Sequence, residues 1–233
     1  IAAIYRCDIS LMISDVEIRL LTEQFKVPAA LLHWCPLMMT PPTDAFVPFE
    51  ERAHFLSIGN FRHAPNWDAV LWMKTAVWPL IRQQLPGAQL HVYGAYTPPK
   101  ATALHNAAQG FHVMNWAEDA LQVMSQARVC LAPLRFGAGI KGKIVDAMLC
   151  GTPNVTTPIG AEGMGGALPW PGAVAQSAQT LADAAVALHQ DRLRWTDAQQ
   201  AGVALLNARY RQTDHGPALI DRLQHCRANL STL

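Results

Sequence analysis

The stretch that decides the fold reads Arg128-Val129-Cys130-Leu131-Ala132-Pro133-Leu134-Arg135-Phe136-Gly137-Ala138-Gly139-Ile140-Lys141-Gly142-Lys143-Ile144-Val145-Asp146-Ala147-Met148-Leu149-Cys150. Residues 128–134 form an apolar run typical of a buried strand, and the glycine-rich residues 135–142 predict a turn. Residues 143–150 predict a short helix, because the Gly and Pro that follow cannot continue it. A second strand is expected at residues 153–157, so the stretch forms a strand–helix–strand unit.

The glycine-rich turn has the features of an anion-binding site. The glycines within residues 137–142 let backbone N–H groups approach a ligand, and the helix that follows presents the positive end of its dipole. Lys141 and Lys143 add positive charge at the same place. Asp146 lies one helical turn after Lys143, where a carboxylate can accept hydrogen bonds from sugar hydroxyls. Together these residues predict a site for a phosphate beside a polyol.

The same glycines satisfy the Gly-x-Gly-x-x-Gly spacing of dinucleotide-binding domains, and Glu162 follows about twenty residues later. In those domains the pattern follows the first strand, whereas several strand and helix patterns precede it in this chain. Lys141 and Lys143 also lie within or next to the turn, which argues further against a dinucleotide-binding site. A nicotinamide or flavin site and a purely structural turn are kept as alternatives to the anion site.

A longer pattern extends over residues 132–148 and 151–163. It resembles the nucleotide-sugar-binding half of retaining glycosyltransferases of family four. In many members this segment carries one Glu, then seven residues, then a second Glu. Asp146 matches the second acidic position, whereas Ala138 stands at the first, and a branch of the family has a glycine-lysine version of the segment.

The resemblance implies a fold and a function. The fold is α/β, with a Rossmann-like, doubly wound parallel sheet that forms the C-terminal half of a two-domain GT-B architecture. The activity is metal-independent, retaining transfer of a sugar from a UDP- or GDP-linked donor, of the hexosyltransferase type and without a cofactor. The resemblance also implies bacterial glycan biosynthesis, with a carbohydrate or lipid-linked acceptor and peripheral membrane association of the full-length protein. A nucleotide-sugar epimerase of the same architecture and a non-catalytic nucleotide-binding domain remain open.

The resemblance also assigns roles to single residues. Arg62 and Lys143 are expected to be catalytic, because they would stabilise the charge of the leaving diphosphate. Val113 and Met114 are expected beside the nucleobase, and Asp146 at the ribose. The other expected contacts with the nucleotide sugar are Gly59, Asn60, His63, Arg135, Gly137, Ala138, Gly139, Ile140, Lys141 and Glu162. No metal-binding residue is expected, and no Asp-x-Asp occurs in the sequence.

The resemblance and the positions of the prolines together predict the domain boundaries. Residues 1–35 resemble the last strand–helix–strand of an N-terminal, acceptor-binding domain, whose remainder is expected outside this sequence. Residues 36–52 contain four prolines and predict a linker, and residues 53–233 are the expected donor-binding domain. The chain by itself is therefore expected to bind a nucleoside diphosphate but to transfer no sugar.

Within residues 53–233, strand and helix patterns alternate with short loops, which predicts a parallel, doubly wound sheet. Pro79 lies inside one amphipathic helical pattern and predicts a kink or a break near Val77. Residues 98–108 are predicted to form a single short helix.

Four predicted loops each follow a strand, at residues 59–63, 113–116, 135–143 and 160–163. Ligands of doubly wound sheets bind beyond the carboxyl ends of the strands, so these loops are expected to meet at one site. Trp116 is interpreted as packing, with stacking on a base as the alternative.

Composition limits the remaining classes of protein. The 233 residues are 51% hydrophobic and 15% charged, which suits a compact cytoplasmic globule. The net charge of +1 gives no reason to expect nucleic acid as a partner. The five cysteines are scattered, without the paired spacing of a zinc site. No run of eighteen apolar residues and no signal-peptide pattern are found, so a cytoplasmic protein is expected.

Overall fold

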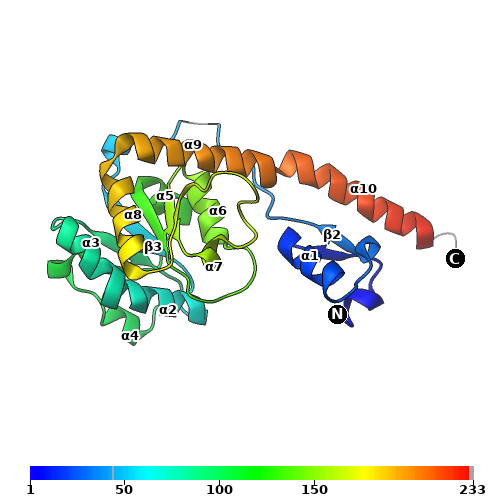
Figure 1. Cartoon of the computed structure of the whole chain (residues 1–233), viewed down its shortest axis with the longest axis horizontal. Helices are drawn as coiled ribbons and strands as arrows, with labels where there is room; N and C mark the ends of the chain where they lie inside the picture. The colour runs from blue at the N-terminus through cyan, green and yellow to red at the C-terminus, as the bar shows by residue number, and fades with distance from the viewer. Residues whose placement is uncertain (44, 231–233) are drawn as a thin grey trace.

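The computed structural model describes residues 1–43 and 45–230. Residue 44 of the predicted linker and residues 231–233 of the predicted donor-binding domain lie outside the described residues. Figure 1 shows a large α/β part, a small N-terminal part, and a linker and a C-terminal helix that run between them. The large part is built on the strands β3 (His54–Ile58), β4 (Leu90–Tyr93), β5 (Phe111–Asn115), β6 (Ala127–Ala132), β7 (Asn154–Thr156) and β8 (Gly172–Val174).

These strands form a six-stranded sheet in the order β5-β4-β3-β6-β7-β8, and all neighbours are parallel. The chain moves outward from β3 to β5, then crosses back to β6 and moves outward to β8. This is the Rossmann-like, doubly wound order, and its topological switch point lies between β3 and β6. The predicted fold class is confirmed.

Helices cover both faces of the sheet (Figure 1). On one face, α2 (Ala64–Trp72), α3 (Trp78–Gln84) and α8 (Ala178–Gln190) bury a large apolar core. On the other, α5 (Ala120–Gln126) and α6 (Gly142–Leu149) pack on β3 and β6, and α9 (Arg192–Arg209) packs on α6. Five of the six residues of β6 are buried, as its continuous apolar run predicts for a central parallel strand.

Near Val77, where the sequence predicts a kink or a break, the helix changes its period but does not stop. A π-helical turn, η4 (Met73–Val77), separates α2 from α3, and Pro79 lies in the first turn of α3. Proline has no N–H to donate and its ring clashes with the preceding turn, so the helix widens immediately before it. The shorter elements are α4 (Pro99–Thr102), α7 (Pro158–Ala161) and the 3-10 turns η3 (Phe49–Glu51) and η5 (Ala107–Gln109).

The small N-terminal part contains two parallel strands, β1 (Ser10–Met12) and β2 (Leu32–Trp34), with α1 (Asp15–Glu23) between them. The Ser14 hydroxyl oxygen accepts a hydrogen bond from the Val16 N–H, which fixes the start of α1. Two 3-10 turns, η1 (Ile4–Arg6) and η2 (Ala29–Leu31), complete this part. The assignment of residues 1–35 to an acceptor-binding domain stays a prediction.

The linker and the C-terminal helices are tied together at one point. The Met39 N–H donates to the Tyr210 carbonyl at 2.6 Å, and the Gln212 N–H donates to the Met39 carbonyl at 2.9 Å. Here α9 ends and α10 (Gln212–Leu230) begins, and α10 runs on beside the N-terminal part (Figure 1). Arg209 also reaches across to Asp15, with Nη2 and Oδ2 3.0 Å apart. Within residues 1–43 and 45–230, no helix has the length and apolar character needed to cross a membrane.

Candidate functional site

A pocket of about 240 Å³ opens at the switch point of the sheet. It is bounded by the loops that follow β3, β4 and β5 and by the helices α5 and α6. The lining residues are Ile58, Gly59, Asn60, Gly94, Ala95, Trp116, Ala117, Ala120, Met124, Lys143 and Asp146. Four separate stretches of the sequence therefore converge where a doubly wound sheet binds its ligand.

The pocket has a polar side and an apolar side. Lys143 and Asp146, one turn apart on α6, supply a cation and a carboxylate. Small and apolar side chains from α5 and the loop before it form the remaining wall. Trp116 is 67% exposed at this wall, which argues against its interpretation as core packing. Such a pocket suits a ligand with a flat apolar part and an anionic part.

Lys143 is held at the polar side by a residue that the sequence did not single out. Its ammonium donates to Asn66 Oδ1 at 2.7 Å, and Asn66 Nδ2 donates to the Asn60 carbonyl at 2.9 Å. Burial lowers the pKa of Lys143 to about 8. A buried ammonium with a neutral partner favours the binding of an anion.

Asp146 lines the same pocket, and burial raises the pKa of its carboxyl group. Within the part of the chain that the structure describes, its carboxylate accepts no hydrogen bond from another side chain or from the backbone. Its oxygens are therefore available to a ligand, although the ribose contact stays a prediction.

The glycine-rich turn lies beside the pocket rather than in its wall. Gly137 and Gly139 have φ of 129° and 74°, a left-handed conformation that only glycine adopts without strain. Lys141 is not among the residues that line the pocket. The Lys141 ammonium donates to the Gly139 carbonyl and its side chain is buried. Burial lowers the pKa of Lys141, and the charges of Glu162 and then Glu17 oppose that change.

Arg62 and His63 lie in the turn between β3 and α2, outside the pocket wall. Both are exposed. The Arg62 guanidinium lies 3.6 Å from the centroid of the Tyr96 ring, and its backbone N–H donates to Asn60 Oδ1 at 2.8 Å. His63 precedes the first turn of α2. The predicted contact of Arg62 with a diphosphate stays a prediction.

The other predicted contacts flank the pocket. Arg135 is paired with Asp68 of α2, with Arg135 Nε and Asp68 Oδ2 2.8 Å apart. Val113 is buried in the core and Met114 is exposed at the end of β5. Ala138 and Glu162 are exposed, and Ile140 and Gly139 are partly buried. The structure thus brings together Gly59, Asn60, Lys143 and Asp146 among the predicted residues, and adds Asn66 and Trp116.

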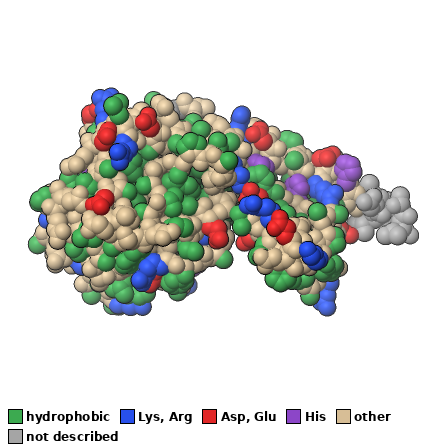
Figure 2. Space-filling view, viewed as in Figure 1, with side chains coloured by type: hydrophobic (Ala, Val, Ile, Leu, Met, Phe, Trp, Pro, Cys, Tyr) green, Lys and Arg blue, Asp and Glu red, His purple; other side chains and the backbone are tan. Residues whose placement is uncertain are grey.

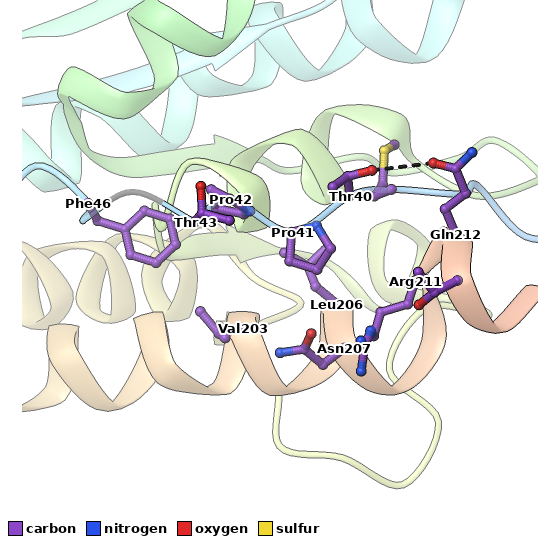
Figure 3. A pocket seen from close by; sticks show the side chains of 12 residues that line it. Thr40, Pro41, Pro42, Thr43, Phe46, Val203, Leu206, Asn207, Arg211 and Gln212 are labelled. Carbon is purple, nitrogen blue, oxygen red and sulfur yellow. Dashed lines mark hydrogen bonds between the residues drawn. The ribbon is translucent and has the colours of Figure 1, made fainter.

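A second pocket, of about 410 Å³, lies between the linker and the junction of α9 and α10 (Figure 3). Figure 3 shows Pro41 and Phe46 of the linker facing Leu206 and Val203 of α9, with the Thr40 hydroxyl donating to Gln212 Oε1. This pocket is larger, but none of its lining residues follows a strand of the six-stranded sheet. We therefore place the functional site at the switch point.

Charge elsewhere on the molecule is mixed. On the face shown in Figure 2, basic and acidic side chains are interspersed, which agrees with the net charge of +1. Among residues 1–43 and 45–230, no group of three His, Cys, Asp or Glu side chains is arranged to hold a metal ion.

The sheet order defines a Rossmann-like α/β domain, and the pocket at its switch point is a candidate ligand site. The sequence model of one family, described as glycosyl transferases group 1, matches residues 52–191, which is more than half of the chain. The chain belongs to this family. The glycine pattern follows β6, the fourth strand of the sheet, so neither its position nor the family supports the nicotinamide or flavin alternative. No curated protein matches the sequence.

Solved structures of GT-B glycosyltransferases share the fold. A mutant of TarM from S. aureus, in complex with fondaparinux, alpha-GlcNAc-glycerol and UDP, superposes with a TM-score of 0.75 at 10% identity over 94% of this chain and 44% of that one. The pneumococcal O-GlcNAc transferase GtfA, with UDP and GlcNAc, gives 0.68 at 16% identity over 94% and 46%. HepE from Anabaena, with UDP and glucose, gives 0.66 at 15% identity over 97% and 64%. The chain spans less than two thirds of each of these proteins.

Proposed function

We propose that this chain binds the donor of a retaining GT-B glycosyltransferase, which transfers a sugar from a nucleoside diphosphate sugar. One observation carries the proposal. Lys143 and Asp146 stand one helical turn apart on the polar side of the switch-point pocket, opposite an apolar wall with an exposed Trp116. A nucleoside diphosphate has three parts that match this order in the pocket: a flat base for the apolar wall, a ribose for Asp146 and a diphosphate for Lys143. The UDP in the related TarM, GtfA and HepE structures supports a uridine nucleotide.

In this proposal the base lies against Trp116, the ribose near Asp146 and the diphosphate near Lys143. The backbone N–H groups at the start of α6 add the positive end of the helix dipole. Arg62 would join them from the turn after β3. Catalysis would be electrostatic and independent of a metal, because these fixed positive groups stabilise the charge that grows on the leaving diphosphate.

The remaining assignments follow from family membership and the likeness to longer enzymes. Residues 1–35 would belong to the acceptor side, and residues 53–233 to the donor side. The acceptor would be a carbohydrate or lipid-linked glycan of a bacterial pathway. The chain alone would then bind the donor nucleotide without transferring its sugar.

Calorimetry with UDP, GDP, uridine and NAD tests the proposal. We expect UDP to bind more tightly than uridine, and thermal unfolding to show stabilisation of about 2.7 kcal/mol at a hundred times the dissociation constant. Lys143→Ala should weaken UDP binding far more than uridine binding, whereas Lys100→Ala, which removes an exposed lysine, should change neither. Binding of NAD in preference to every nucleoside diphosphate would contradict the proposal. An epimerase would instead convert the sugar of the donor without any acceptor, which product analysis detects.

A further inference from the structure

Asn66 connects three segments at the switch point. It lies in the first turn of α2, and its side chain is partly buried. Its amide oxygen accepts from the Lys143 ammonium of α6 at 2.7 Å, and its amide nitrogen donates to the Asn60 carbonyl after β3 at 2.9 Å. The amide is thereby fixed in one orientation, with its oxygen toward the lysine.

Gly59 provides the space in which this pair meets. A Cβ atom at position 59 would lie 2.7 Å from Lys143 Nζ and 2.8 Å from Asn66 Cγ, closer than Cβ atoms approach other heavy atoms in proteins. The ammonium and the amide therefore pack directly on the backbone at the carboxyl end of β3. A ligand that reaches this backbone also reaches the ammonium.

The partner of Lys143 is neutral, and this property matters for the site. A carboxylate at position 66 would neutralise the ammonium and compete with an anionic ligand, whereas an amide orients the ammonium and leaves its charge uncompensated. The thiol of Cys130, whose pKa burial raises to about 12, is the titratable group of β6 that influences Lys143. On α6 the carboxylate of Asp146 lines the same pocket.

Two other charged groups of the surrounding elements have partners of their own. Asp68, on the same helix as Asn66, is paired with Arg135. In the turn after β3, Arg62 lies over the Tyr96 ring. The amide of Asn66 is therefore the group that orients the Lys143 ammonium.

We propose that Asn66 is a positioning residue, whose amide oxygen holds the Lys143 ammonium where it meets the diphosphate of the donor. This inference rests on the proposed function. It deepens that function because it makes donor affinity depend on the proton of Lys143. Deprotonation of Lys143, with its pKa near 8, should weaken UDP binding as the pH rises from about 7 to about 9. Uridine shares the base of UDP but has no diphosphate, so the ratio of UDP affinity to uridine affinity should fall over this pH range.

The test compares Asn66→Asp and Asn66→Ala with the wild type, by calorimetry with UDP and uridine across this pH range. In Asn66→Asp the new carboxylate raises the pKa of Lys143, so the decline in UDP affinity should move to higher pH. At pH 7 its UDP affinity should fall about tenfold, because the carboxylate competes with the diphosphate for a charged hydrogen bond. Asn66→Ala should also lose UDP affinity and move the decline to lower pH. Asn207→Asp adds the same charge to an exposed site on α9 and should change neither quantity.

The two hypotheses fail differently. If the wild type binds UDP no better than uridine, the proposed function is wrong and so is the inference that rests on it. If the wild type prefers UDP but both Asn66 variants keep its affinity and its pH profile, the proposed function stands and the positioning role is refuted. Asn66→Asp is nearly isosteric, so the pH profile remains measurable even if Asn66→Ala does not fold.

Discussion

Replacement of Arg52 by lysine should destabilise the protein more than a change of one cation for another normally does. Arg52 is fully buried at the end of the linker. Burial lowers the pKa of its guanidinium to about 10, so the group stays charged at neutral pH. Among residues 1–43 and 45–230, its hydrogen-bond partners are carbonyl and hydroxyl oxygens, and none is a carboxylate. It donates to the Val47 carbonyl at 2.8 Å, the Ala127 carbonyl at 3.1 Å, Thr152 Oγ1 at 2.6 Å and the Cys150 carbonyl at 2.8 Å.

The magnitude follows from the geometry of these bonds. The four acceptors surround a planar fork, and a compact lysine ammonium can reach one or two of them. Hydrogen bonds to charged groups contribute about 1.5–3 kcal/mol each, so the loss of two bonds predicts about 3–6 kcal/mol. For a chain of this size, 1 kcal/mol lowers Tm by about 2–4 °C, and Arg52→Lys should lower Tm on the order of 10 °C.

Thermal and urea unfolding followed by circular dichroism measure this loss. The control is Arg192→Lys, because the Arg192 side chain forms an exposed pair with Glu50, and such pairs contribute about 0–1 kcal/mol. If Arg52→Lys and Arg192→Lys unfold at the same temperature, the buried hydrogen bonds contribute little and the reasoning is refuted.

Three further predictions concern the pocket and the sheet. Asp146→Asn should weaken UDP binding about tenfold, as measured by calorimetry. A 2′,3′-dideoxyribose analogue of UDP should bind the wild type weakly, and the substitution should weaken its binding little further, because the same hydrogen bonds are already absent. Trp116→Ala should weaken UDP and uridine binding equally, by about 1–3 kcal/mol, if the base stacks on the indole, and unequal losses would place the ring elsewhere. Burial and then the charge of His91 lower the pKa of His54 to about 4, so stability should be full above about pH 6.5 and fall as the pH drops toward 4. His54→Phe should flatten the dependence of Tm on pH, and an equally steep dependence in the variant would exclude His54 as its source.

The alternation of strands and helices was predictable because proline and glycine mark most of its boundaries. β6, α6 and β7 agree to within about two residues with the strand, helix and strand predicted at residues 128–134, 143–150 and 153–157. The single helix predicted at residues 98–108 is wrong, since the structure has α4 of four residues and a separate 3-10 turn. The Asn106 side chain accepts from the Gln109 N–H and so starts the turn anew, which is the local competition that asparagine offers to a helix.

Site residues that lie on one segment could be predicted from the sequence. Contacts between segments far apart in the sequence could not. Lys143 and Asp146 share a helix whose period places them on one side. Asn66 is 77 residues from Lys143 in sequence, and a neutral amide produces no charge pattern. The ion pair of Arg135 depends in the same way on Asp68, 67 residues away. Such contacts are properties of the folded sheet and have no signature in a single sequence.

Arg52, Lys141 and Lys143 differ in how many hydrogen-bond acceptors and negative charges surround them. This difference distinguishes cations that stabilise the fold from a cation that is available to a ligand. Arg52 has four fixed acceptors close to where β6 begins, so little of its charge is available to a ligand. Lys141 has the Gly139 carbonyl and the charges of two glutamates, which compensate it from both parts of the molecule. Lys143 has one neutral amide and lines the pocket at the carboxyl ends of the strands. Of these three cations, Lys143 should therefore interact most strongly with a bound anion. Its charge is removed from water, and its neutral partner does not compensate it.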